Sequence, residues 1–331
     1  MVMPYLGYGT RTRVRLCGRV LQDEGLRPAR DVQTRWRNLV AFYKRLESDE
    51  VPGARLRATL ADRVLEVLSD REGYFTLRFD GLALKPGWHP VRMALVEKPS
   101  VRAVGRVLVP SARARFGVIS DIDDTVVISN VRNKLKMVLA LALSNARTRK
   151  PFKGVAAFYR ALHAGANPVF YVSKSPWNLY APLVEFLRLQ GLPAGPLMLR
   201  DFGLRMKKGH KTAAIEDILR TYPKLPFVLI GDSGEEDPEI YSDIVQRFAG
   251  RIRVIYIRSV NGKRIAQVER LVAVVAPTGA QLVLAPDSEF AAAHAAGEGL
   301  IQASRLRDIR SDRRSDESSG SKPLASSGAL K

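Results

Sequence analysis

Cysteine is almost absent from this chain of 331 residues, which contains Cys17 alone. A single cysteine cannot close a disulfide within the chain, and no spacing of cysteine and histidine resembles a zinc site. The disulfide-rich secreted domains and the zinc modules are therefore excluded, and a reducing cytosol fits the composition best.

Long apolar runs are also absent. No window reaches about 18 consecutive apolar residues, the length that a membrane-spanning helix needs. The amino-terminal residues contain no basic segment followed by a long apolar run and a small-residue cleavage site, so we expect no signal peptide. With 46% hydrophobic residues, the chain has enough apolar side chains for the full core of a soluble globular protein, and its length favours two domains. We predict a cytoplasmic protein, with peripheral contact to a membrane left open.

Acidic residues are few relative to basic ones. The chain has 33 Asp and Glu against 53 Lys and Arg, which gives a formal net charge of +20. Such a surface attracts the phosphates of nucleic acid or the headgroups of anionic lipid. The sign of the charge does not choose between these partners, and a solvated surface that only favours solubility is the plainer alternative.

Residues 1–112 show a strand-like pattern. Short runs of alternating apolar and polar residues, such as "RTRVRLCGRVL" from Arg11, are separated by turn signals. We predict a small β-sandwich-like accessory domain, interrupted by one helical stretch over residues 31–48. Arg11, Arg13 and Arg15 fall on one face of a strand because side chains alternate with period two. That face is either a surface for anionic lipid or a solvated outer face.

From residue 113 to residue 303, short apolar strands alternate with helical segments. This alternation is typical of an α/β domain with a parallel, Rossmann-like sheet that is buried on both faces. Residues 304–331 are too polar and too low in complexity to bury a core, so we expect a disordered basic and serine-rich tail.

The stretch "GVISDIDDTV", residues 117–126, places three aspartates directly behind a short apolar strand. Asp121 and Asp123 are two positions apart, so both carboxylates can face one divalent cation while Ile122 points back into the protein. Helix capping is the alternative, but it explains only one of the carboxylates. A calcium loop of the EF-hand type is excluded because Val126 stands where that loop needs glycine.

Three further segments carry chemistry at the end of a strand or the start of a helix. "VFYVSKS" places Ser173 at a strand end, "GHKTAAIEDI" places Lys211 at a helix start, and "FVLIGDSGEEDPEIY" places Asp232 and Asp237 after an apolar strand. In an open parallel sheet, ligands bind beyond the carboxyl ends of the strands. We therefore expect these side chains to gather around one site.

The four segments resemble, in kind and order, the motifs of the haloacid dehalogenase superfamily of phosphotransferases: DxDxT, a strand-end Ser or Thr, a Lys, and Gly-Asp followed by a second acid. The matching residues are Asp121, Asp123 and Thr125; Ser173; Lys211; and Asp232 with Asp237. The flanking words "SDIDDTV", "YVSKSPWNLY", "LRDFG", "GHK" and "IGDSGEEDPEIY" are similar to the catalytic domain of actin-patch-associated phosphatidate phosphatases over residues 115–260. Lys174 departs from the serine-rich wording of that family and leaves Ser173 in place.

The resemblance implies a haloacid dehalogenase fold and a role for each motif. Asp121 would be the nucleophile that forms an aspartyl phosphate, and Asp123 would be the general acid and base. The implied phosphate-binding residues are Thr125, Ser173 and Lys211. The implied Mg²⁺ ligands are Asp121, Asp123 (through its backbone carbonyl), Asp232 and Asp237.

An apolar segment with basic ends, around residues 134–147, lies where superfamily members insert a substrate-selecting cap. It could rest at a bilayer interface or cover the sheet as a buried helix. The first interpretation favours a Mg²⁺-dependent phosphatidate phosphatase that releases diacylglycerol at an anionic membrane. The alternatives are a phosphatase acting on nucleic acid ends or a soluble phosphomonoester, and an inactive module that binds anionic surfaces.

Overall fold

The computed structural model describes residues 1–22, 50–122, 154–200, 209–259 and 264–320. Several sequence-based predictions lie outside these ranges: Asp123, Thr125, the helical stretch over residues 31–48, and the segment around residues 134–147. None of the helices within the described ranges is both long enough and apolar enough to cross a membrane.

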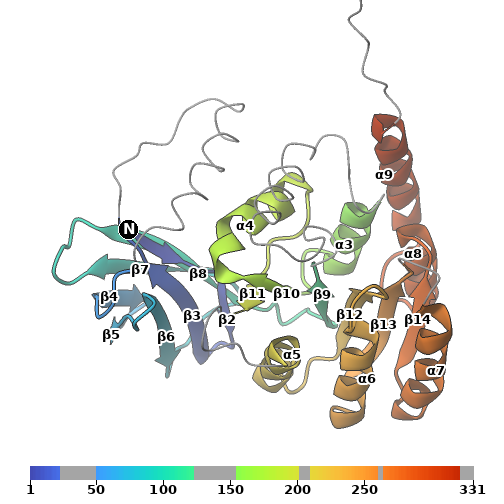
Figure 1. The fold of residues 1–331 in the computed structure, drawn as a ribbon, viewed down its shortest axis with the longest axis horizontal. Helices are drawn as coiled ribbons and strands as arrows, with labels where there is room; N and C mark the ends of the chain where they lie inside the picture. Colours follow the sequence, from blue (N-terminus) through green and yellow to red (C-terminus); the bar gives the residue numbers. More distant parts are fainter. Residues whose placement is uncertain (23–49, 123–153, 201–208, 260–263, 321–331) are drawn as a thin grey trace, which may run out of the picture.

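The amino-terminal region is built from strands (Figure 1). The strands are β1 (Val2–Pro4), β2 (Gly7–Gly9), β3 (Arg13–Val20), β4 (Arg55–Leu60), β5 (Arg63–Leu68), β6 (Tyr74–Asp80), β7 (Gly87–Leu95) and β8 (Arg102–Val109). They form one sheet in the order β1-β3-β2-β8-β7-β4-β5, with β6 paired to β3. Alternate side chains such as Leu56, Leu77 and Val91 are fully buried in a common core. The predicted β-rich region is confirmed, although all its strands belong to one continuous sheet.

The second region is an α/β domain with a parallel sheet. Its strands are β9 (Gly117–Asp121), β10 (Val169–Pro176), β11 (Leu197–Arg200), β12 (Phe227–Asp232), β13 (Ile252–Arg258) and β14 (Gln281–Ala285), in the order β11-β10-β9-β12-β13-β14. All five neighbouring pairs are parallel. The predicted α/β fold class, with a Rossmann-like parallel sheet, is confirmed.

Helices cover both faces of this sheet, which explains why its strands are nearly continuous apolar runs. One buried cluster contains side chains of α3 (Val155–His163), α4 (Tyr180–Leu189) and α8 (Ser288–Gly297). The cluster on the other face contains side chains of α5 (His210–Thr221), α6 (Asp237–Arg247) and α7 (Ile265–Val275). Short 3₁₀ turns, Trp177–Leu179 and Ala276–Thr278, precede α4 and follow α7.

A last helix, α9 (Arg305–Gly320), stands where the sequence predicted the start of a disordered tail. Ile309 is fully buried, and Asp312 accepts a hydrogen bond from the backbone N–H of Ala157 at the start of α3. Arg310 and Arg313 form ion pairs with Glu289 on α8 at 2.6 and 3.1 Å. These few contacts hold α9 against the α/β domain. The polarity of the segment as a whole gave no sign of them. Residues 321–331 lie outside the described ranges.

Aromatic stacking joins the two regions. The ring of Tyr5, between β1 and β2, stacks on Trp177 with centroids 4.4 Å apart, so Trp177 is a packing residue. Arg15 on β3 forms an ion pair with Asp217 on α5 at 2.7 Å. Arg13 on the same strand pairs with Asp80. Two of the three arginines that the sequence grouped on one face are thus held by carboxylates of this chain.

Candidate active site

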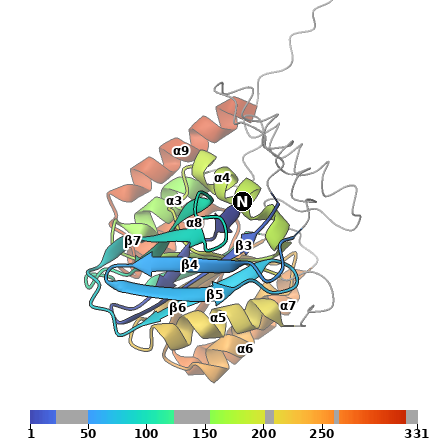
Figure 2. The same ribbon diagram turned by 90° about the vertical axis from the view of Figure 1, so that its left-hand side faces the viewer.

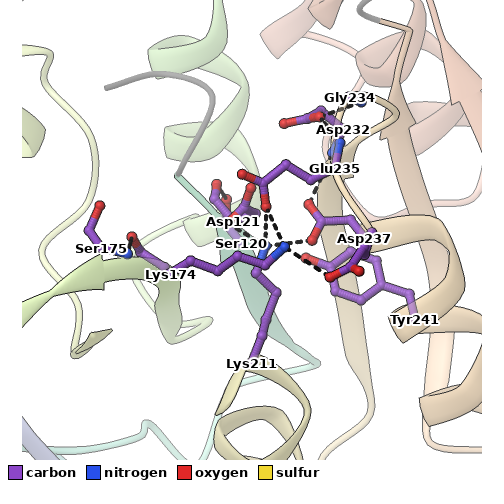
Figure 3. A network of polar contacts seen from close by, with 12 residues as sticks. Ser120, Asp121, Lys174, Ser175, Lys211, Asp232, Gly234, Glu235, Asp237 and Tyr241 are labelled. Carbon is purple, nitrogen blue, oxygen red and sulfur yellow. Dashed lines mark hydrogen bonds and ion pairs between the residues drawn. The ribbon is translucent and has the colours of Figure 1, made fainter. Parts of the chain in front are cut away.

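The carboxyl end of the parallel sheet gathers five of the predicted site residues. Asp121 ends β9 and Asp232 ends β12, while Ser173 lies in β10 directly after Val172, the residue paired with Asp121. Lys211 lies in the first turn of α5, and Asp237 is the first residue of α6. Parallel strands end at one edge of a sheet, so segments separated by more than 100 residues meet there (Figure 3).

Three carboxylates form a compact cluster at this edge. Asp121, Asp232 and Asp237 each offer an oxygen, and these oxygens lie within 4.8 Å of one another. The side chain of Asp237 is completely buried, and that of Asp121 is 3% exposed. Hard cations such as Mg²⁺ prefer oxygen ligands of this kind. The donor set therefore fits a magnesium ion.

Lys211 is the buried cation of the site. Its Nζ lies 2.8 Å from Oδ1 of Asp121 and 2.5 Å from Oδ1 of Asp237, and its side chain is only 1% exposed. A lysine at the start of a helix is often a solvated surface residue, and this geometry excludes that interpretation. A buried ammonium group needs carboxylate partners, and it has them here.

Burial has a large effect on the acids of the cluster. It raises the pKa of Asp121 well above its ordinary value, and the charge of Asp237 adds to this, while Lys211 acts in the opposite direction. Burial likewise raises the pKa of Asp237 to about 6 against the opposing effect of Lys211. One ammonium group is therefore insufficient to offset the carboxylates, and a divalent cation would supply the missing charge.

Glycine is required directly before Asp232. A Cβ atom on Gly231 would lie 2.5 Å from Oδ2 of Asp237, which is inside the van der Waals contact distance. This close approach allows Oδ2 of Asp237 to accept a hydrogen bond from the backbone N–H of Asp232 at 3.2 Å. The Gly-Asp pair thus packs the first residue of α6 against the end of β12.

The carboxylate of Asp232 organises the loop that follows it. Its Oδ1 accepts hydrogen bonds from the backbone N–H groups of Gly234 at 2.7 Å and Glu235 at 3.2 Å. On the other side of Asp121, Ser173 is completely buried. Its Oγ accepts the backbone N–H of Ser175 at 2.9 Å, so the hydroxyl is held at the strand end.

Sequence reasoning missed a buried hydroxyl pair behind Asp121. The hydroxyl groups of Ser120 and Tyr159 lie 2.6 Å apart, and Oγ of Ser120 also donates to the backbone carbonyl of Asp121 at 2.8 Å. Ser120 belongs to the apolar strand and Tyr159 to a helix that is distant in sequence. No local pattern marks this contact, which fixes the backbone of Asp121.

Sequence reasoning also missed an ion-pair cluster at the mouth of the site. Nζ of Lys174 lies 3.1 Å from carboxylate oxygens of both Glu235 and Glu236. Glu235 reaches further, to 3.5 Å from Nζ of Lys211. In the sequence, Lys174 is a departure from the family wording, and Glu235 and Glu236 lie between the predicted site residues Asp232 and Asp237. The opposite charges of Lys174 and the two glutamates are visible in the sequence, but the sequence does not show that these side chains lie close together.

An apolar cavity of about 80 Å³ adjoins the carboxylates. Asp121 and Asp232 form part of its wall, and most of the remaining wall is apolar. It is contributed by Phe158 on α3, Phe186 on α4 and Ala291 on α8, among others. The polar end of the site thus continues into a space suited to hydrocarbon.

The placement of the predicted residues is therefore uneven. Asp121, Ser173, Lys211, Asp232 and Asp237 gather as expected. Asp123 and Thr125 lie outside the described residues, so their assigned roles remain predictions.

Comparison with known proteins finds relatives for the part of the chain that contains this site. Residues 116–259 match the family model described as "Phosphatidate phosphatase APP1, catalytic domain". Phosphatidate phosphatase APP1 of Saccharomyces cerevisiae is 32% identical over 151 residues, which cover 43% of this chain and 26% of that protein. An uncharacterized protein of Schizosaccharomyces pombe is 30% identical over 155 residues, which cover 45% of this chain and 26% of that protein.

Among solved structures, a haloacid dehalogenase family hydrolase from Deinococcus radiodurans with bound phosphate and sodium is 20% identical, with a TM-score of 0.34. The match covers 57% of this chain and 99% of that one. The sequence matches span only about a quarter of the length of the two yeast relatives. The residues that match the family model, 116–259, include all five gathered site residues. The predicted resemblance to the catalytic domain of the phosphatidate phosphatases is therefore confirmed over that range.

Proposed function

We propose that this protein is a Mg²⁺-dependent phosphatase that hydrolyses phosphatidate to diacylglycerol and phosphate. The observation that carries the proposal is the contact of Asp121 with the buried Lys211 inside the cluster formed with Asp232 and Asp237. A carboxylate at a strand end, next to a fixed cation, is equipped to attack phosphorus. The family match supports the same chemistry.

In this mechanism the carboxylate of Asp121 forms a bond to phosphorus while the bond to the leaving oxygen breaks. Asp123, in the role that the resemblance gives it, donates a proton to that oxygen and then takes one from the attacking water. Water cleaves the aspartyl phosphate, which releases phosphate and restores Asp121. Lys211 and Ser173 bind phosphoryl oxygens, the first through its charge and the second through its hydroxyl.

Asp121, Asp232 and Asp237 would hold the magnesium ion. When bound, the ion supplies positive charge that offsets both the carboxylates and the phosphoryl oxygens. Lys211 favours the anion of Asp121, because its ammonium group opposes the effect of burial on the pKa of that carboxyl, although it does not cancel that effect.

A lipid substrate is supported by the apolar cavity beside the carboxylates. A phosphate ester with a hydrocarbon part can place that part against Phe158 and Phe186, whereas a small hydrophilic ester has no apolar group to fill this space. The wall next to the reacting phosphate therefore favours an amphiphile over a sugar phosphate.

Attachment to an anionic membrane is supported by the outer face of β4, β5, β7 and β8. Residues directly opposite each other in antiparallel strands share a face, and the pairing places arginines beside exposed apolar side chains. The pairs are Arg55 with Leu68, Arg92 with Val104, Ala94 with Arg102, and Pro90 with Arg106. Leu68, Val64 and Val104 are 60 to 65% exposed. We call this surface the arginine face. Its strands β4 and β5 lie on the side of the molecule opposite the α/β domain (Figure 2).

The arginine face combines the two features that an interfacial surface needs. Apolar side chains can enter the headgroup region, and arginines can pair with lipid phosphates there. The stacking of Arg106 on Trp88, with the guanidinium 4.8 Å from the ring centroid, adds an aromatic group to the same surface. Arg13 and Arg15 are held by ion pairs within the chain. On the arginine face itself, Arg55 pairs with Glu97 at 3.5 Å.

Replacing Arg92, Arg102 and Arg106 together with glutamine is expected to weaken binding to anionic vesicles by roughly 100-fold, at about 1 kcal/mol for each arginine. Vesicle sedimentation at low salt measures the effect. The control is a triple glutamine variant of three exposed arginines on α7 and α9, Arg270, Arg305 and Arg307, which loses the same charge. Equal loss in the two variants would show that net charge alone, rather than the arginine face, attracts the protein.

A substrate comparison tests the function itself. Phosphate release is measured from phosphatidate in mixed micelles, from a 3′-phosphorylated oligonucleotide and from a soluble aryl phosphate, each with Mg²⁺ and with chelator. The proposal expects the highest kcat/KM for phosphatidate and loss of activity in chelator. Faster release from the oligonucleotide would replace the lipid substrate with nucleic acid ends. Binding that persists in chelator without release from any substrate would leave a non-catalytic module.

A further inference from the structure

The carboxylate of Glu235 lies between two ammonium groups at the mouth of the site. Its Oε2 is 3.1 Å from Nζ of Lys174 and 3.5 Å from Nζ of Lys211. The two lysines come from different elements, the end of β10 and the start of α5, and their ammonium groups converge beside Asp121 (Figure 3). An anionic oxygen held between two lysines next to a nucleophile is the arrangement that a phosphoryl group requires.

The position of the Glu235 carboxylate is electrostatically unfavourable. Glu235 adds to the repulsion around Asp121, so both carboxylates draw on the same Lys211. Its side chain is still 21% exposed, whereas those of Lys211 and Asp237 are 1% and 0% exposed. Glu235 therefore lies on the more exposed side of the cluster.

We propose that the carboxylate of Glu235 occupies the position of the phosphoryl group in the substrate-free protein. When phosphate binds, it displaces this carboxylate and contacts the ammonium groups of both Lys174 and Lys211. The inference rests on the proposed function, because it takes the site to bind a phosphoryl group. It assigns a substrate-binding role to Lys174, the residue at which this chain departs from the serine-rich wording of its family.

The exchange needs only a side-chain rotation. Oδ1 of Asp232 fixes the backbone N–H groups of Gly234 and Glu235, so the loop can stay in place while the carboxylate swings towards solvent. Lys174 keeps its charge throughout. Burial alone would lower its pKa, but Glu235 and Glu236 more than offset this and raise it above the ordinary value.

Glu236 provides a matched control beside Glu235. Its carboxylate also lies 3.1 Å from Nζ of Lys174, but of these two acids it is Glu235 that lies within 3.5 Å of Nζ of Lys211. Glu236 is 74% exposed. Neutralising either residue removes one negative charge next to Lys174, and only one of these changes removes the carboxylate that competes with phosphate.

The test is the affinity of the full chain for inorganic phosphate, measured by titration calorimetry in the presence of Mg²⁺. Glu235→Gln is expected to tighten phosphate binding roughly three- to tenfold, because a competing anion is removed. Glu236→Gln is expected to change the affinity by less than about twofold. Lys174→Gln is expected to weaken it roughly tenfold, as the loss of a charge-assisted hydrogen bond.

Thermal unfolding of each variant separates these effects from loss of structure. Glu235→Asp retains the charge but shortens the reach to Lys211, so this second variant is expected to bind phosphate with intermediate affinity. Weaker or unchanged binding in Glu235→Gln would overturn the inference, as would unchanged binding in Lys174→Gln or no measurable phosphate binding by the wild type. Release of phosphate from phosphatidate by the wild type is scored separately. If the phosphate affinities follow the expected order but phosphatidate is not hydrolysed, the inference about Glu235 and Lys174 stands and only the proposed substrate is rejected.

Discussion

Asp121→Asn is expected to lower the rate of phosphate release by about 10⁴-fold or more, which is the scale seen when a covalent nucleophile is removed. An amide does not attack phosphorus, and the substitution leaves the rest of the cluster intact. Steady-state phosphate release from phosphatidate in mixed micelles measures the effect. The control is Asp243→Asn on the exposed side of α6, where the acid pairs with Arg247 at 2.6 Å and is expected to leave the rate unchanged.

The same variant separates catalysis from stability. Burial raises the pKa of Asp121, which means that the fold opposes its ionised form, and a neutral amide of similar shape removes that conflict. The metal-free Asp121→Asn protein is therefore expected to unfold at the same temperature as the wild type or higher. Retention of more than about a tenth of the wild-type rate by a folded Asp121→Asn protein would exclude Asp121 as the nucleophile.

Lys211→Met is expected to reduce activity by roughly 10³-fold and to destabilise the metal-free protein by about 3 to 5 kcal/mol, the cost of breaking a buried ion pair from one side. The reason is that Asp121 and Asp237 lose the ammonium group that lies within 2.8 Å of both. Urea denaturation measures the stability. The control is Lys224→Met, since Lys224 is exposed after the end of α5.

Two additions make this prediction specific to charge. Added Mg²⁺ is expected to restore part of the lost stability, because a cation among the three carboxylates replaces some of the missing charge. Lys211→Met in the Asp121→Asn background is expected to cost less than in the wild type, because one of the uncompensated acids is gone. If Lys211→Met were equally destabilising with and without Mg²⁺ and in both backgrounds, its role would be packing.

In the proposed function, the two regions of the molecule contribute different features for binding a lipid. The α/β domain places Asp121 and the buried Lys211 beside an apolar cavity. The β-rich region presents the arginine face and is joined to the domain by the stacking of Tyr5 on Trp177. Because Arg15 also pairs with Asp217 on α5, the β-rich region contacts the helix that carries Lys211.

Much of the α/β domain could be predicted from the sequence alone. Apolar strands alternating with helices specify a parallel sheet, and the carboxyl ends of its strands meet at one edge. Asp121 and Asp232 end two such strands and Ser173 lies in the second half of a third, so their meeting is a consequence of local pattern and chain topology. The β-rich character of residues 1–112 followed from period-two alternation in the same way.

The sequence by itself determined which strands form the α/β sheet and which acids follow them, because strand periodicity and motif order are local properties of the chain. Only the tertiary structure decided that Glu235 lies between Lys174 and Lys211, that α9 docks through Ile309, and that Arg15 is paired within the chain. The physical reason is that ion pairs and packing depend on side chains that are far apart in sequence, and charge or polarity averaged over a segment carries no information about which partner each side chain meets.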